Sequence, residues 1–296
     1  MAATARREVC GMARFVLSAF ADEAADSLSE QIEALRAEDI GLIELRGVDG
    51  KNCADLTLDE ARRIRETLAS AGIGFSALGS PFGKYPIDRP FAPHRDAFRH
   101  GLEICRELGC GRVRMFSFFI PAGDDPAKWR GEVLDRLSAM LDAAEDAGIL
   151  LVHENEKEIY GDTDARCQDL LAHFGGRLGF AFDPANFIQC GVDPLPAFER
   201  LHGQITYMHI KDALKADGSV VRAGRGDGSV KAILARINRE RDVDFILTVE
   251  PHLALFGGLQ SLQRDPLANA EVFADRKTAF RAACAALKQI LEEICA

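Results

Sequence analysis

Ionisable residues directly follow apolar segments at four places in the second half of the chain. The segments read "GILLVHENE", "LGFAFDPAN", "ITYMHIKD" and "FILTVEPH". A charge at the edge of an apolar core costs free energy unless another group pairs with it. The sequence therefore predicts a common partner for the charged residues that end these segments, which are Glu154, Asp183, His209 and Glu250.

A divalent metal ion is the partner that this set of side chains favours. Three carboxylates and one imidazole form a hard, mostly oxygen donor set, which suits Mn²⁺, Mg²⁺ or Co²⁺ and tolerates Zn²⁺. A divalent cation would also keep the carboxylates ionised in a partly dry site. One such residue alone is more often a helix N-cap or a surface residue, but equivalent positions in four successive segments favour one metal site.

The segments that must position these residues alternate in type along the whole chain. Short apolar segments predict strands at 15–20, 40–45, 73–78, 112–118, 148–153, 178–182, 205–210 and 245–249. Longer segments with helical spacing of apolar residues predict helices at 25–38, 58–71, 92–109, 126–147, 163–174, 194–202, 228–240 and 268–294. Strict alternation implies parallel strand pairing.

Eight such units predict an α/β protein with a single (β/α)8 TIM barrel, for which 296 residues are enough. A doubly wound open sheet is the alternative. That fold usually carries a glycine-rich fingerprint after its first strand, whereas "SAFADEA" here contains no glycine. Active sites of TIM barrels lie at the C-terminal ends of the strands, and neighbouring strands are about 4.8 Å apart. The four candidate ligands can therefore converge on one point.

Composition excludes several functional classes. The apolar content of 47% and charged content of 28% are those of an ordinary globular protein. The net charge of −10 disfavours nucleic acid as a partner, and no apolar run is long enough to suggest a membrane partner. The eight cysteines form no CxxC pair, so we expect reduced thiols and a cytoplasmic location.

Both the start of the chain and its last loop depart from the regular pattern. We expect residues 1–13 to be a disordered N-terminal extension and residues 14–296 to form the barrel. The segment 252–273 is long for a last connection between strand and helix, and its "GGLQS" is a candidate lid or oligomer contact.

Several motifs carry a resemblance to a known family. They read "FADE", "IELRGVDGKN", "GSPFGKY", "HENEKEIYGDT", "FDPANFIQCG", "HIKDA" and "VEPH". With these motifs the chain resembles the xylose-isomerase-like TIM barrels, a superfamily of sugar isomerases and epimerases, over roughly residues 14–292. The resemblance implies a small sugar or polyol-derived substrate and a homo-oligomer, either a dimer or a tetramer.

The resemblance also implies a mechanism. Glu154, Asp183, His209 and Glu250 match the family's ligands to one divalent metal ion (Mn, Mg, Co or Zn). The metal polarises the carbonyl of a sugar or sugar phosphate and stabilises an enediolate. Glu154 and Glu250 would then be the catalytic acid/base pair, one removing a proton from carbon and the other returning it.

Other residues at strand ends are candidate substrate contacts. They are Glu44, Lys84, Asn186, Lys211, Arg222 and His252. Arg222 and Arg225 belong to "RAGRGDGS", which either binds phosphate or is a glycine-rich turn that precedes a helix. Asp212 is expected to orient His209, and alternation along the strand turns His153 away from Glu154.

Three other functions remain to be weighed. An inosose-dehydratase-type lyase would use the same metal site, with His252 or Lys84 as the acid that aids the leaving hydroxyl. A sugar-binding barrel without activity is expected to have lost a ligand, and none is missing here. The endonuclease branch carries additional histidine ligands, including one at the position of Asn186, and is disfavoured.

Overall fold

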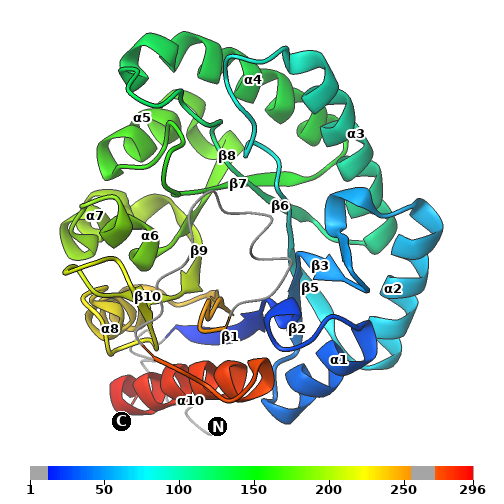
Figure 1. Cartoon of the computed structure of the whole chain (residues 1–296), viewed down its shortest axis with the longest axis vertical. Coiled ribbons are helices and arrows are strands. Elements are labelled where there is room, and N and C mark those ends of the chain that lie inside the picture. The colour runs from blue at the N-terminus through cyan, green and yellow to red at the C-terminus, as the bar shows by residue number, and fades with distance from the viewer. Residues whose placement is uncertain (1–12, 255–270, 296) are drawn as a thin grey trace, which may run out of the picture.

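Parallel strands form the centre of the molecule and helices surround them (Figure 1). The computed structural model describes residues 13–254 and 271–295. Within these residues the barrel strands are β1 (Arg14–Ala19), β2 (Leu42–Leu45), β5 (Gly74–Gly79), β6 (Arg112–Met115), β7 (Leu150–Glu154), β8 (Leu178–Phe182), β9 (Ile205–Ile210) and β12 (Asp244–Val249).

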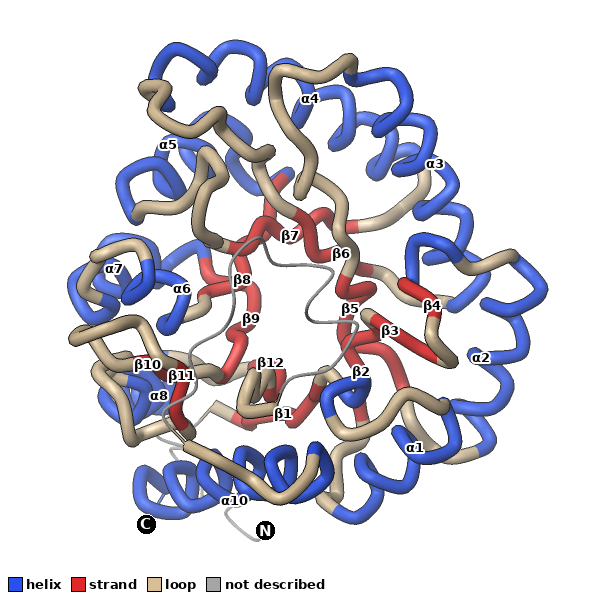
Figure 2. The backbone as a smooth tube through the Cα atoms, in the orientation of Figure 1, coloured by secondary structure: helices blue, strands red, loops and turns tan. Residues whose placement is uncertain are grey.

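These strands close into one barrel, as the strand ring in Figure 2 shows. Their order is β1-β12-β9-β8-β7-β6-β5-β2, and every neighbouring pair in the ring is parallel. The closing pair joins the first and last strands of the barrel, β1 and β12, with Arg14 opposite Asp244 and Ala19 opposite Val249. The predicted single (β/α)8 TIM barrel is confirmed, and the open doubly wound sheet is not what forms.

The long helices lie outside the strands, each close to its predicted position. They are α1 (Leu28–Ala37), α2 (Leu58–Ser70), α3 (Phe91–Leu108), α4 (Arg130–Asp146), α5 (Asp164–Phe174), α7 (Pro194–Leu201), α8 (Val230–Glu240) and α10 (Arg276–Cys295). Local chemistry sets their ends. Thr57 and Glu60 form a capping box at the start of α2, and α3 ends at Gly109, whose φ of 71° suits glycine.

Three short additions lie among the loops at the strand ends. The helix α6 (Pro184–Gln189) follows β8 directly. Two hairpins are formed by β3 (Gly47–Val48) with β4 (Lys51–Asn52), and by β10 (Asp212–Ala213) with β11 (Val220–Val221). The sequence pattern predicted none of them, because each is too short for a periodic signal.

Strand β6 ends at Met115, earlier than the predicted end at residue 118. Beyond it, the backbone leaves the ladder and bonds to a neighbouring loop. Phe116 N–H donates to Phe82 O at 2.8 Å, and Phe118 N–H donates to Gly83 O at 2.9 Å. These bonds fasten the loop that carries Lys84 to the end of β6.

Strand alternation divides the buried side chains into two groups. A small group fills the barrel interior: Ala77, Val152, Ala181 and Tyr207. A much larger apolar core lies between the strands and the helices, and it includes Leu151, Phe180 and Met208. Residues in phase with the interior group therefore point to the barrel axis at the strand ends, where the candidate site lies.

Two predictions fall mainly outside the described residues. Of the expected N-terminal extension only Ala13 is described, and its N–H donates to Asn238 O at 3.3 Å. The segment "GGLQS" of the expected lid lies within residues 255–270, which are also outside. Among the described helices, none has the length and apolar character needed to cross a membrane.

Candidate metal centre

Four predicted ligands meet at the C-terminal end of the barrel. Each offers one donor atom, and these atoms all lie within 4.8 Å of one another. All four side chains are buried. We call this set the metal quartet: Glu154, Asp183, His209 and Glu250. It comes from β7, from the residue after β8, from β9 and from the residue after β12, so the structure brings together what the strand-end pattern predicted.

Asp183 serves two local purposes with its two carboxylate oxygens. Oδ1 accepts the N–H of Asn186 at 3.0 Å and so caps helix α6. Oδ2 is buried and accepts no hydrogen bond among the described residues. The helix-cap role and the ligand role, which the sequence presented as alternatives, are compatible because each uses a different oxygen.

His209 presents its two ring nitrogens to different partners. Nδ1 lies 2.8 Å from Glu154 Oε1 and 3.4 Å from Glu250 Oε2, so it faces the quartet. Nε2 lies 3.2 Å from both oxygens of Glu44. Burial lowers the pKa of His209, but the surrounding carboxylates outweigh it and raise that pKa well above its ordinary value. An Nε2–H held by Glu44 leaves Nδ1 as the atom that can ligate a metal.

Asp212 does not orient His209, so that prediction is wrong. Its carboxylate instead accepts the N–H groups of Gly224, Gly226 and Gly228 at 2.8–3.0 Å. The glycine-rich loop is wrapped around this one side chain, and a Cβ at Gly226 would lie 2.4 Å from Asp212 Oδ1. Glu44 is the residue that holds His209, and it lies at the end of β2 on the opposite side of the barrel interior.

Two asparagines fix the carboxylates of β7 and β8. Asn186 Nδ2 donates to Glu154 Oε1 at 3.1 Å and to Asn155 O at 2.8 Å. Asn155 joins the two strand ends, because its amide donates to Asp183 O and accepts from Asp183 N–H. Asn186 therefore contacts the carboxylate of Glu154 directly, whereas Asn155 holds Asp183 through its backbone.

His153 points away from the quartet, as alternation predicted. Its Nε2 lies 3.0 Å from Ser117 Oγ, and its ring stacks on Phe180 at 6.1 Å in the layer between strands and helices. Burial lowers its pKa to about 3, so this histidine is neutral in the folded core.

A divalent cation fits the charges around the quartet. Lys211 Nζ lies 2.9 Å from Asp183 Oδ2 without hydrogen-bond geometry, and 3.2 Å from Glu250 Oε2. Asp183 Oδ2 is thus a buried oxygen that accepts no hydrogen bond and already lies beside a cationic group, which makes it a suitable donor atom for a metal cation. The three carboxylates and His209 Nδ1 would hold the ion, with Lys211 beside two of them.

Arg46 contacts Glu250, and its guanidinium forms ion pairs with three acidic residues. It donates to Asp22 at 2.9 and 3.0 Å, to Glu23 at 3.1 Å and to Glu250 at 3.1 Å. Burial raises the pKa of Glu23 to about 8 despite Arg46. Asp22 and Glu23 belong to "FADE", and the sequence analysis did not recognise them as site residues.

His252 stands beside this cluster, in line with the expectation that it follows the direction of Glu250. Its Nε2 lies 3.3 Å from Glu250 Oε1, and its backbone N–H donates to Glu23 Oε2 at 2.6 Å. The bond to Glu23 holds His252 at a φ of 49°. Burial lowers the pKa of His252 to about 3, so its ring is neutral.

Cations and aromatic rings alternate along a wall beside the quartet, where Arg46 contacts Glu250 and Arg114 lies near Glu154. Arg46 lies 4.4 Å from the ring centre of Phe20, and Arg114 lies 5.5 Å from it. Arg114 and Lys84 each lie 4.6 Å from the ring centre of Phe116. Such contacts hold cationic side chains in fixed positions. We call these five residues the cationic wall.

Lys84 lies in this wall, next to a carboxylate. Its Nζ donates to Glu156 Oε2 at 2.8 Å. Burial alone would raise the pKa of Glu156, but Lys84 and Lys211 bring it down to about 2.

A cavity of about 20 Å³ lies between the cationic wall and two members of the quartet, Glu154 and Glu250. Its lining combines both sides and is formed by Arg46, Gly79, Ser80, Lys84, Arg114, Phe116, Glu154, Glu156, Glu250 and His252. This volume holds about one water molecule, so side chains of the wall must move for a substrate to enter. Glu44 is not in the lining, because it lies against His209.

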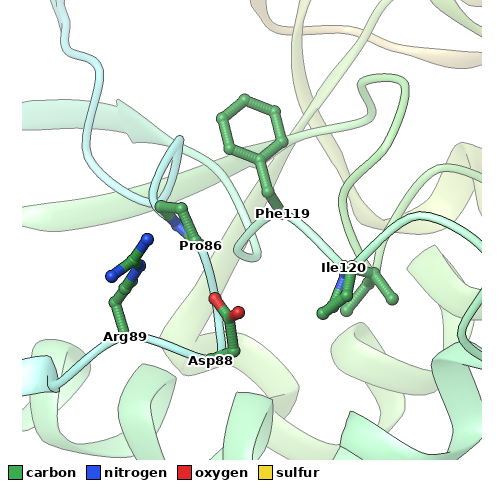
Figure 3. Close-up of a pocket in the computed structure, with 6 residues that line it drawn as sticks. Pro86, Asp88, Arg89, Phe119 and Ile120 are labelled. Atoms are coloured by element: carbon green, nitrogen blue, oxygen red, sulfur yellow. The ribbon is translucent and has the colours of Figure 1, made fainter.

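Arg222 lies away from this cavity. Its guanidinium and backbone N–H bind the carboxylate of Glu271 at 2.8–3.1 Å. A larger hollow of about 220 Å³ lies between the loops 86–89 and 119–121 (Figure 3). It contains one charge of each sign, Asp88 and Arg89, and none of the quartet.

Comparisons with known proteins agree with the geometry. The sequence model of the family described as "xylose isomerase-like TIM barrel" matches residues 32–289. The chain belongs to the xylose isomerase-like TIM barrel family. No curated protein sequence matches it.

Several solved structures share the fold at low identity. One titled "Structure of L-ribulose 3-epimerase" has a TM-score of 0.72 and 18% identity, covering 96% of each chain. The probable 3-DHS dehydratase AsbF from Bacillus anthracis has a TM-score of 0.71 and 14% identity, covering 94% of this chain and 99% of that one. The IOLI protein "with a binding zinc atom" has a TM-score of 0.70 and 17% identity, covering 95% of this chain and 99% of that one.

Proposed function

We propose that this family member is a divalent-metal-dependent isomerase or epimerase. Its substrate is a small sugar or polyol-derived α-hydroxycarbonyl compound, and the reaction passes through an enediolate. The observation that carries the proposal is the buried metal quartet, in which two glutamates stand with an aspartate and a histidine whose Nδ1 faces them. The metal, when bound, supplies polarisation of the substrate carbonyl.

Glu154 and Glu250 are the proposed acid/base pair. They come from β7 and from the end of β12, which are separated in the barrel by β8 and β9. Burial disfavours the charge on Glu250, but Lys211 and His209 hold its pKa well below the usual range. Glu250 is therefore in the ionised form that a general base requires. Glu154, oriented by Asn186, would return the proton from its side of the site.

The same cavity supports a lyase as the second candidate. Elimination needs a group that protonates the leaving hydroxyl. His252 is poorly suited, since burial lowers its pKa to about 3 and keeps the ring in its neutral, weakly acidic form. Lys84 lines the cavity and is the other candidate, and a structural neighbour is a probable 3-DHS dehydratase. A sugar-binding barrel without activity is disfavoured because the whole quartet is present.

An unphosphorylated substrate suits this site better than a sugar phosphate. The glycine-rich loop after β9 is where TIM barrels often bind phosphate. Here three of its N–H groups donate to Asp212, and Arg222 is paired with Glu271. The usual phosphate donors are thus already satisfied within the protein.

Two further expectations stay proposals. A reducing, cytoplasmic location is supported by the described cysteines, all of which are free thiols. A dimer or tetramer rests on the family resemblance alone, and analytical ultracentrifugation would test it.

Proton exchange tests the proposed chemistry. The purified protein with Mn²⁺ is incubated in D₂O with ketoses, inososes and keto acids, and C–H signals are followed by NMR. We expect deuterium incorporation next to the carbonyl of one substrate class, abolished by EDTA and reduced by about 10²–10⁴-fold in Glu154→Gln and Glu250→Gln. Exchange followed by loss of a hydroxyl would establish the lyase. No exchange with any compound, despite tight metal binding, would contradict the proposal.

A further inference from the structure

We propose that the substrate carries a carboxylate and that Arg114 binds it. This inference rests on the proposed function, since it assigns a substrate class to the same site. Arg114 stands near the end of β6, in the wall of the cavity and beside Glu154 of the quartet. None of the motifs that carry the family resemblance includes this position.

Arg114 has hydrogen-bonding capacity that the described residues leave unused. The residue is 4% exposed. Its guanidinium makes one hydrogen bond with them, from Nη1 to Ser80 O at 2.8 Å. Nε is buried and has no hydrogen-bond partner, although it lies 3.2 Å from Glu154 Oε2 and 3.7 Å from Glu44 Oε1. Buried donors without acceptors cost free energy, which a ligand with acceptor oxygens would recover.

The charge partners of Arg114 are claimed by other groups. Glu154 is a member of the quartet, so its charge is directed to the metal when the ion is bound. Glu44 accepts from Tyr207 at 3.0 Å and lies 3.2 Å from His209 Nε2. A carboxylate on the substrate would give the buried guanidinium a counterion of its own.

The guanidinium is also held in a fixed position, as recognition of a carboxylate requires. Arg114 lies against the rings of Phe20 and Phe116, and Ser80 Oγ donates to its backbone carbonyl at 2.6 Å. Gly79 allows this close packing, because a Cβ there would lie 2.5 Å from Phe20 Cε1. A planar, pre-positioned guanidinium matches the two oxygens of a carboxylate.

The other cations near the cavity are less suited to this task. Arg46 donates to Asp22, Glu23 and Glu250, and Lys84 donates to Glu156. The filled glycine-rich loop favours a carboxylate over a phosphate, because its N–H groups already donate to Asp212. The substrate class that follows is an α-hydroxy keto acid or a sugar acid.

Binding of small fragments tests this assignment without turnover. Glycolate and glycolamide differ only in carboxylate against amide, and each is titrated calorimetrically into the protein with and without Mn²⁺. We expect the Mn²⁺ protein to prefer glycolate, and Arg114→Gln to reduce that preference by about tenfold or more. Arg114→Lys keeps the charge without the planar donor pair, so its preference for glycolate should lie between those of the wild type and Arg114→Gln. Arg99→Gln, the same change at an exposed site on α3, should match the wild type.

Each result decides the question. An equal preference for glycolate over glycolamide in the wild type and Arg114→Gln would mean that the metal alone recognises the carboxylate, which overturns the proposal. Tighter binding of inorganic phosphate, lost in Arg114→Gln, would overturn it in favour of a phosphate ester. Absence of glycolate binding would also overturn it. If Arg114→Gln does not fold, Arg114→Lys carries the test. A protein that binds no Mn²⁺ refutes the proposed function separately, and the titrations without metal still report on Arg114.

Discussion

His209 Nε2 lies 3.2 Å from the carboxylate of Glu44, on the side of the ring away from the metal quartet. Both side chains are fully buried, and the contact crosses the barrel interior from β9 to β2. A carboxylate behind a ligating histidine fixes the ring orientation and makes the free nitrogen a better ligand. We therefore predict that Glu44 positions His209 for metal binding.

Glu44→Gln should weaken metal binding. The variant keeps an acceptor for His209 Nε2–H but loses the charge, and we expect Mn²⁺ affinity to fall by about 10–100-fold. Equilibrium dialysis with Mn²⁺ measures it, and Glu44→Ala should be weaker still. If both variants bind Mn²⁺ as the wild type does, Glu44 does not position the ligand.

Asn186→Leu should disturb Glu154 while preserving the shape of the site. Asn186 Nδ2 donates to Glu154 Oε1 and to Asn155 O, so the change removes two buried hydrogen bonds. We expect the free energy of unfolding to fall by about 1–3 kcal/mol and metal affinity to fall with it. Urea unfolding and Mn²⁺ titration of the same preparation measure the two effects. Unchanged metal affinity would show that Asn186 does not hold Glu154.

Asp212→Asn should destabilise the fold. The variant turns an NH₂ group toward glycine N–H groups that now donate to a carboxylate. We expect a loss of about 1–3 kcal/mol in the free energy of unfolding, the range for buried donors left without an acceptor. The control is Asp146→Asn on the exposed end of α4, which should stay within about 0.5 kcal/mol of the wild type. Equal stability of the two variants would contradict the role of Asp212 as the centre of this loop.

His94 should make the protein sensitive to acid. Its Nε2 accepts the N–H of Gly83 at 3.0 Å, next to Lys84, and burial lowers its pKa to about 4. Between pH of about 6.5 and about 4, His94 is protonated in the unfolded chain but remains neutral in the folded chain. The stabilisation is therefore complete above pH of about 6.5 and is lost as the pH falls toward 4.

His94→Gln should flatten this pH dependence. The slope of the free energy of unfolding against pH should fall by up to about 1.4 kcal/mol per pH unit in that window. Urea unfolding at several pH values measures it. The control Ala97→Gln, at an exposed position of the same helix, should leave the slope as it is. Identical slopes in wild type and His94→Gln would rule out this titration.

The fold and the metal quartet were predictable because they depend on regular signals. Strand alternation and the position of each strand end place Glu154 and His209 on the same side of the barrel, without any long-range information. Asp183 and Glu250 follow from the same rule.

The rest of the site depends on side-chain directions that one sequence does not encode. Arg114 sits inside the apolar run "RVRMFSF" and gives no strand-end signal, so its place in the cavity was missed. Asp212 was expected beside His209 because it is close in sequence, but the short hairpin β10–β11 turns it toward the glycine-rich loop. Arg222 was a candidate substrate contact, and the structure pairs it with Glu271.

The most direct measurement is the stoichiometry and location of the metal. Mn²⁺ binding is followed by electron paramagnetic resonance for the wild type, Asp183→Asn, His209→Gln and the exposed control Asp146→Asn. We expect one tight site per chain in the wild type and the control. In both quartet variants it should weaken by about 100-fold or more, because loss of a ligand costs more than the roughly 10–100-fold of an outer-shell change. Mn²⁺ binding that is absent in the wild type, or that survives unchanged in Asp183→Asn and His209→Gln, would contradict this expectation.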